Sequence, residues 1–183
     1  MQVPDKPDNE AQRLNALEQL EILDTDSEER FDRVTRLAKR LFDVPIAVVS
    51  LVDSDRQWFK SCYGIDAQET PRDVSFCGHA ILGTDPFIIS DATKDERFAD
   101  NPLVVGEPGV RFYAGVPLVH HDDSMLGTLC VIDTKPRQFN QEQVNDLVDL
   151  AKIVEQELAT RVTATTDPLT HISNRRGFSS LGE

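Results

Sequence analysis

Long hydrophobic runs are missing from this sequence. Its longest apolar segments have the length of a β-strand, far short of what a helix needs to cross a bilayer. The first residues have neither the basic flank nor the apolar stretch of a signal peptide. Disulfide pairing is not indicated either, because Cys62, Cys77 and Cys130 are odd in number and widely spaced, which suits a reducing compartment. We therefore expect a cytoplasmic protein without a membrane partner.

Positive charge is also scarce. The chain has 19 Lys and Arg residues against 32 Asp and Glu residues, a formal net charge of -13, and its basic residues form no cluster. Such a surface repels the phosphate groups of nucleic acids and of anionic membranes, so we expect no nucleic-acid partner. A length of 183 residues leaves room for one full domain with appendages, but not for two full domains.

Three segments have the periodicity of amphipathic helices. Residues 1–9, which precede them, are polar and contain prolines, and we expect them to be disordered. A first helix follows from Glu10, a second spans residues 28–42, and a third spans residues 140–161. The predicted buried face of the second helix consists of Phe31, Val34, Leu37, Ala38 and Leu41.

Between the second and third helices the apolar pattern changes to that of β-strands. We predict strands over residues 45–52, 56–63, 86–90, 110–119 and 125–133, and a short helix over residues 76–82. A long polar loop, residues 91–109, is of a kind that is usually functional. Local hairpins without a regular βαβ alternation favour an α+β fold, with a central antiparallel sheet and helices packed mainly on one face.

Several strings of residues resemble bacterial GAF sensor domains. They are residues 76–81 (FCGHAI), 91–98 (DATKDERF), 111–118 (RFYAGVPL) and 127–133 (GTLCVID). The resemblance covers residues 14–161 and, with the flanking helices, implies a GAF-type sensor domain over residues 10–161. It implies a GAF-like α+β fold with a sheet of about six strands. It also implies a regulatory module that senses a small molecule or mediates dimerisation.

A second resemblance begins at Asp167. Residues 167–178 (DPLTHISNRRGF) are similar to the opening of a GGDEF domain, the catalytic domain of diguanylate cyclases, with His171 and Ile172 in place of the usual Gly and Leu. The resemblance implies that residues 162–183 are a linker and the truncated start of that domain. Because the family's catalytic loop lies further along, we expect no catalytic residue in this chain. The full-length protein would be a diguanylate cyclase that this sensor regulates.

Cys77, His79 and Cys130 suggest a rival function. Together they could serve a small redox or metal-dependent enzyme, but ligand pairs at the spacing of zinc sites are missing, so we predict no metal site. A simpler interpretation is a buried thiol beside a hydrogen-bonded histidine, with Cys130 inert in an apolar strand. The signature of chromophore-binding GAF domains is incomplete, since Gly78 separates Cys77 from His79, and that of cyclic-nucleotide-binding GAF domains is absent. The sequence therefore identifies no cofactor.

We predict a small-molecule site around the long loop and the strand that follows it. Arg111 would pair with an anionic group of the ligand, and the two aromatic rings after it would stack or pack. In the alternative, one of these rings belongs to the core and Arg111 pairs with Asp91 or Asp95. The predicted ligand-binding residues are Asp91, Arg111, Phe112, Tyr113, His79 and Cys77.

The last helix carries an apolar stripe at alternating three- and four-residue steps. The stripe is shorter than three heptads, so it either covers the core of a monomer or pairs with a second subunit. Because an output domain would follow this helix, we predict a parallel homodimer through it. The residues of the stripe are Val144, Leu147, Ala151, Val154 and Leu158.

Overall fold

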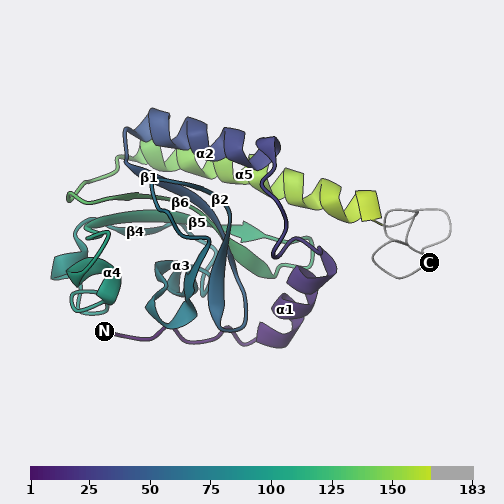
Figure 1. The fold of residues 1–183 in the computed structure, drawn as a ribbon, viewed down its shortest axis with the longest axis horizontal. Helices are drawn as coiled ribbons and strands as arrows, with labels where there is room; N and C mark the ends of the chain where they lie inside the picture. The colour runs from purple at the N-terminus through teal and green to yellow at the C-terminus, as the bar shows by residue number, and fades with distance from the viewer. Residues whose placement is uncertain (166–183) are drawn as a thin grey trace.

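The computed structural model describes residues 1–165, with side chains to residue 161, and is built on one six-stranded antiparallel sheet (Figure 1). The strand order is β3-β2-β1-β6-β5-β4, which confirms the predicted α+β class. A three-residue edge strand, β3, was not predicted, since so short a segment shows no period. The predicted linker and GGDEF start lie outside the described residues from residue 166 on. The strands are β1 (Ile46–Val52), β2 (Arg56–Tyr63), β3 (Glu69–Pro71), β4 (Phe87–Ile89), β5 (Phe112–Val119) and β6 (Met125–Asp133).

Two long helices, α2 (Glu29–Phe42) and α5 (Gln141–Thr165), lie side by side across one face of the sheet (Figure 1). They bury alternate residues of the central strands, because successive side chains of a strand point to opposite faces. We name this layer the helix-side core. Its strand residues include Val49, Leu51, Phe112, Ala114, Leu129 and Val131.

Short elements cover the other face of the sheet. They are α3 (Phe76–Ala80), α4 (Pro102–Val105) and two single turns of 3₁₀-helix, Arg72–Val74 and Ala92–Lys94. The intervening residues of the same strands point into this second layer, which we name the loop-side core. It includes Val48, Val52, Tyr113, Cys130 and Ile132. Four short pieces of chain fill space less completely than two long helices, and a cavity remains on this side.

Helix α1 (Glu10–Gln19) is fixed to the sheet by charge as well as by apolar packing. The side chain of Arg13 is fully buried and donates to the carbonyl oxygen of Val52 at 2.6 Å. Arg13 and Arg72 both bind the carboxylate of Glu10. Burial alone would raise the pKa of Glu10, but the two arginines lower it to about 2. A buried arginine requires such pairing, and the leucine pattern of this segment gave no sign of it.

The buried face of α2 differs from the prediction. Phe31, Val34 and Ala38 are buried as expected, but Leu37 is 45% exposed and Leu41 is 56% exposed. The helix is rotated so that Thr35 and Phe42 face the sheet instead. Thr35 can be buried there because its hydroxyl shares a 2.6 Å hydrogen bond with the hydroxyl of Ser61 on β2.

The N-terminal segment, residues 1–9, also differs from its predicted disorder. Pro4 is buried against Gly78 of α3, where a Cβ atom would lie 2.8 Å from the proline ring. The backbone of Gln2 donates to the carbonyl oxygen of Arg97 at 3.0 Å and accepts a 3.0 Å hydrogen bond with the ring of His79. Because Gly78 has no side chain, the ring of Pro4 has space to pack against it. Composition alone does not reveal this contact.

The apolar stripe of α5 belongs to the helix-side core of the same chain. Leu147, Val154 and Leu158 are 1%, 0% and 3% exposed, and Ala151 is buried beside them. The predicted dimer contact through these residues is therefore wrong, since their side chains are already covered by the sheet and by α2. The neighbouring Ile153 is 45% exposed.

In the described residues, no helix combines the length and hydrophobicity of a membrane span.

Truncation of α5 side chains should separate the buried stripe from the exposed side of the helix. We expect Leu147→Ala to reduce the free energy of unfolding by about 2–5 kcal/mol, because it opens a cavity in the core. The matched variant Ile153→Ala should change it by about 0.5 kcal/mol or less in the monomer. Urea denaturation of both variants measures the two values, and equal losses would contradict the placement of the stripe.

Candidate functional site

A cavity of about 370 Å³ lies between the sheet and the short elements of the loop-side core. Its walls are mostly apolar, and its uncharged polar groups come from the strands and from α3. Both properties are typical of sites for small molecules. The apolar lining includes Val48, Phe59, Ile65, Phe76, Leu103 and Ile132, and the uncharged polar lining includes Ser50, Gln57, Thr70, Cys77, Tyr113 and Cys130.

The charge of the cavity lining limits what it can bind. Asp66 and Glu107 line it, and both side chains are exposed. Within the described chain, no lysine, arginine or histidine is among the lining residues. A phosphate or carboxylate would therefore meet negative charge and no cationic partner. The lining fits an uncharged, largely apolar molecule.

Gln57 of β2 organises the polar side of the cavity. Its side-chain oxygen accepts hydrogen bonds from Ser50 of β1 at 3.2 Å and from Ser75 at 2.9 Å. Its amide nitrogen donates to Thr70 of β3 at 2.6 Å. Ser75 also accepts from the backbone nitrogen of Gly78 and so caps α3. One buried amide thus connects three strands with the helix that carries Cys77.

The sulfur of Cys77 accepts hydrogen bonds from two strands. Tyr113 of β5 donates its hydroxyl at 3.2 Å, and Thr128 of β6 donates at 3.1 Å. Burial alone would raise the pKa of Cys77, but hydrogen bonds from Cys130, Thr128 and Tyr113 lower it to about 6. The hydrogen bond to Cys77 and burial together raise the pKa of Cys130 well above its usual value. The hydroxyl donors Tyr113 and Thr128 thus favour ionisation of Cys77 over ionisation of Cys130.

Two of the six predicted ligand-binding residues, Cys77 and Tyr113, line the cavity. Phe112 points into the helix-side core, where its ring centroid lies 4.8 Å from that of Phe139. Arg111 donates to the carbonyl oxygens of Val104 and Val110 at 2.9 and 3.0 Å, and does not line the cavity.

Asp91 and His79 have local structural contacts. Asp91 accepts from the backbone nitrogen of Thr93 at 3.0 Å and caps a 3₁₀ turn. His79 is hydrogen-bonded to the backbone of Gln2 and packs edge-on against Phe98. Burial lowers the pKa of His79, which favours the neutral ring. The three residues of the rival enzyme therefore do not act together, since His79 faces the N-terminal segment while Cys77 lines the cavity with Cys130.

The sequence analysis missed Ser50 and Gln57, although both carry a signal. Each is a polar residue that precedes a buried apolar residue within a strand, and a buried polar group must find a partner. In the described part of the chain, no three His, Cys, Asp or Glu side chains are arranged to hold a metal ion.

Lys60 lies next to the cavity residue Phe59 but points to the opposite face of the sheet. The pairing of β1 with β2 shifts between Val49 and Ser50, so that Val49 faces Ser61 while Ser50 faces Phe59. Lys60 is the extra residue of this β-bulge, so that Lys60 and Ser61 both point to the helix side of the sheet. The ammonium group lies 5.7 Å from the ring centroid of Phe31 on α2.

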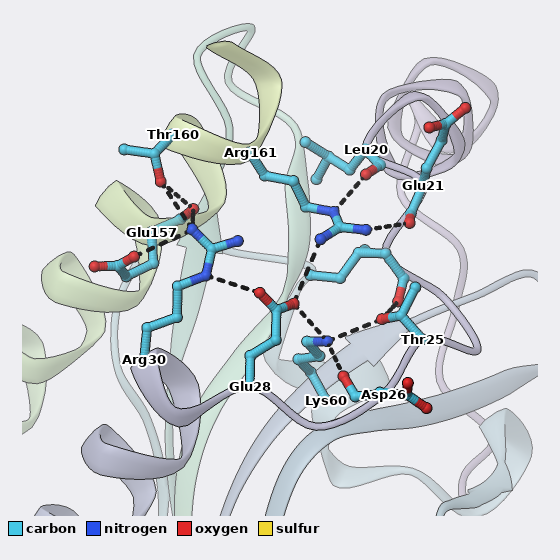
Figure 2. Close-up of polar contacts among 11 residues, drawn as sticks. Leu20, Glu21, Thr25, Asp26, Glu28, Arg30, Lys60, Glu157, Thr160 and Arg161 are labelled. Atoms are coloured by element: carbon cyan, nitrogen blue, oxygen red, sulfur yellow. Dashed lines mark hydrogen bonds and ion pairs between the residues drawn. The ribbon is translucent and has the colours of Figure 1, made fainter. Parts of the chain in front are cut away.

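Figure 2 shows where this ammonium group is bound. Glu28, just before α2, pairs with Lys60 at 2.7 Å, with Arg30 at 3.1 Å and with Arg161 of α5 at 3.4 Å. Arg161 also donates to the carbonyl oxygen of Leu20 at 2.7 Å. We name Glu28, Arg30, Lys60 and Arg161 the Glu28 cluster. It joins β2 to the last described side chain of α5.

Comparisons with known proteins place the chain among its relatives. The chain is 42% identical over 177 residues to a cyclic di-GMP phosphodiesterase of Pseudomonas aeruginosa, and the match covers 96% of this chain. It covers only 30% of that relative, so the chain spans less than a third of the relative's length.

Solved structures of low sequence identity share the fold. The GAF domain of an Acinetobacter phosphoenolpyruvate-protein phosphotransferase has a TM-score of 0.58 at 19% identity, with coverage of 81% of this chain and 94% of that one. A free methionine-R-sulfoxide reductase from Neisseria meningitidis has a TM-score of 0.61 at 19% identity, with coverage of 90% and 99%. The family model of the GAF domain matches residues 26–158, and the chain therefore belongs to the GAF domain family.

Proposed function

We propose that this GAF domain is the regulatory input domain of a cyclic di-GMP signalling protein. The observation that carries the proposal is the 42% identity, over 96% of this chain, to part of a cyclic di-GMP phosphodiesterase. Since the match occupies 30% of that relative, most of the relative lies outside it. In the proposal, the GAF domain senses and a domain further along performs the chemistry.

The enzymatic output can be of two kinds. The resemblance of residues 167–178 to the opening of a GGDEF domain supports a diguanylate cyclase, whereas the relative is named a phosphodiesterase. One activity forms cyclic di-GMP and the other hydrolyses it, so the proposed role of the GAF domain is the same for either. The chain itself supplies no catalytic residue for either reaction in the proposal.

The proposed ligand is a small, uncharged and largely apolar molecule in the loop-side cavity. Apolar walls supply most of the binding energy, and Gln57, Ser50 and Tyr113 supply a few directed hydrogen bonds. The acidic lining residues Asp66 and Glu107 disfavour phosphate-bearing ligands such as cyclic nucleotides.

The route from the cavity to the output passes through β2. A ligand that displaces Phe59 also displaces Lys60, the next residue along the strand. Lys60 is bound to Glu28, and Glu28 is bound to Arg161 of α5. The ligand would thereby change how firmly α5 is held, and α5 leads into the residues that precede the output domain. Such coupling needs differential binding to two arrangements of the Glu28 cluster.

We also propose a homodimer, now through outward-facing residues in place of the buried stripe. Leu37, Leu41 and Ile153 are large apolar side chains left exposed on α2 and α5. Sedimentation over a concentration series should show a dimer for the wild type and a weaker dimer for Ile153→Glu, which places like charges across a two-fold axis. A wild type that stays monomeric, or a variant that dimerises equally well, would contradict this contact.

The Glu28 cluster should make stability depend on acid pH. Burial alone would raise the pKa of Glu28, but Lys60, Arg30 and Arg161 hold it below its ordinary value of 4.5. Because the folded-state pKa is lowered, the carboxylate stabilises the fold above about pH 4.5, and this contribution is lost as the pH falls below that value. We expect Glu28→Gln to reduce the free energy of unfolding at pH 7 by about 1–3 kcal/mol. The deficit should shrink towards pH 3.

The neighbouring residue provides the control. Glu29 is 56% exposed and pairs with Arg36 at the surface, so Glu29→Gln should change the free energy of unfolding much less than Glu28→Gln does. Urea denaturation between pH 3 and pH 8 measures both variants. A deficit for Glu28→Gln that is the same at every pH would contradict the role of its charge.

The regulatory role is tested on the full-length protein. We expect deletion of residues 1–161, and separately Glu28→Gln, to change the rate of cyclic di-GMP formation or hydrolysis several-fold. Glu29→Gln should leave the rate unchanged, and the isolated 183-residue chain should turn over neither GTP nor cyclic di-GMP. A deletion variant with the rates of the full-length protein would contradict an input role for the GAF domain. Turnover by the isolated chain would contradict the assignment of catalysis to a separate domain.

A further inference from the structure

Cys77 lies at a sulfur site built by three elements of the fold. Its sulfur, carried by α3, receives hydrogen bonds from Tyr113 of β5 and from Thr128 of β6 at 3.2 and 3.1 Å. Cys130 of β6 pairs with Gly115 of β5, over which the Tyr113 hydroxyl lies, so Cys130 lies beside the same sulfur and hydrogen-bonds to it. Three donors favour the thiolate form of this sulfur, because a hydrogen bond to a charged acceptor is stronger than one to a neutral acceptor.

The hydroxyl of Tyr113 reaches the sulfur because residue 115 is a glycine. A Cβ atom at Gly115 would lie 2.3 Å from the Tyr113 oxygen and 2.7 Å from the adjacent ring carbon. The ring therefore folds across the bare backbone of its own strand, two residues along, and reaches towards α3. Gly115 positions the donor without touching the sulfur itself.

The two thiols share one cavity, and each has a separate role. Cys77 and Cys130 both line the 370 Å³ space, which gives a small oxidant access to sulfurs that are otherwise buried. Tyr113 and Cys130 are the titratable groups that donate to Cys77, and both have a pKa raised well above the usual value, so both stay protonated donors. Cys77 is consequently the nucleophile of the pair.

We propose that Cys77 and Cys130 form an oxidation-sensitive pair in which a peroxide converts the two thiols into a disulfide inside the cavity. The Cys77 thiolate attacks one peroxide oxygen, the O–O bond breaks, and the departing oxygen leaves as water or an alcohol after taking up a proton. Cys77 becomes a sulfenic acid. The Cys130 sulfur then attacks that sulfur, the S–O bond breaks, and the leaving hydroxide takes the Cys130 proton as water.

This reaction is a sensing function separate from the regulatory role proposed above. The disulfide removes the acceptor that Tyr113 and Thr128 bind, and it joins α3 covalently to β6. The cavity then loses both its thiols and the arrangement of its polar groups. Thiol chemistry can be followed directly on the isolated chain, so its outcome is independent of cyclic di-GMP turnover.

Cys62 is the internal control. It is half-buried, donates to the carbonyl oxygen of Ile65 at 3.5 Å, and burial raises its pKa. Because it stays protonated at neutral pH, it should react with peroxide much more slowly than Cys77.

The test treats the 183-residue chain with hydrogen peroxide, alkylates the remaining thiols and maps the peptides by mass spectrometry. We expect a linked Cys77–Cys130 peptide pair with Cys62 still alkylated. In Cys130→Ser, dimedone should label Cys77 as a sulfenic acid, and Cys77→Ser should show neither product. The variant Cys62→Ser should behave as the wild type. Preferential oxidation of Cys62, or a Cys77 that stays alkylatable, would overturn the proposal.

The role of the hydrogen-bond donors is tested by the oxidation rate of Cys77 and by how that rate depends on pH. The rate at Cys77 should level off above its pKa of about 6, whereas that at Cys62 should rise throughout the neutral range. Thr128→Val, Tyr113→Phe and Gly115→Ala should each lower the oxidation rate of Cys77 several-fold at pH 7. Each should also shift the inflection of the rate to higher pH. Variants with an unchanged inflection would overturn the role of the donors, and sulfenic acid that accumulates in the wild type would overturn that of Cys130.

Discussion

Strands β1, β5 and β6 are buried on both faces, and every other feature of the domain follows from the need to cover both. On one face α2 and α5 achieve this with two continuous helices. On the other face the cover consists of short helices, turns and the N-terminal segment, tied together by hydrogen bonds such as those of Gln57. In the proposed function, the well-filled face transmits movement and the loosely filled face admits a molecule.

Strand β2 is the element on which these two sides meet. Ordinary alternation places the cavity residue Phe59 and the charged residue Lys60 side by side in the chain but on opposite faces. The bulge adds one residue, so that Ser61 as well as Lys60 faces the helices and Cys62 returns to the cavity face. Lys60 has no side-chain exposure, so its ammonium group depends on Glu28 and on the turn at Thr25 for solvation.

The sequence predicted the fold better than the site, for physical reasons. Apolar runs such as residues 45–52 identify a strand without its pairing, because burial on both faces hides the period of two. Whether Phe112 or Tyr113 faced a pocket depended on register, which only the sheet determines. The α5 stripe was recognised as apolar, but its own sheet covers it. Arg13 shows the same limit, since a buried guanidinium depends on a carboxylate placed by tertiary structure.

The alternation along β6 has a consequence for how this domain can vary in length. Leu129 and Val131 serve one core while Cys130 and Ile132 serve the other, and Gly127 lies so close to Ser50 that a Cβ atom would meet its carbonyl oxygen at 1.9 Å. Inserting or deleting one residue there would exchange the two sets and bring a side chain against that carbonyl. The turn between β5 and β6 carries no such restriction. Length variation among homologous domains should therefore concentrate in turns such as this one and be absent from the middle of the central strands.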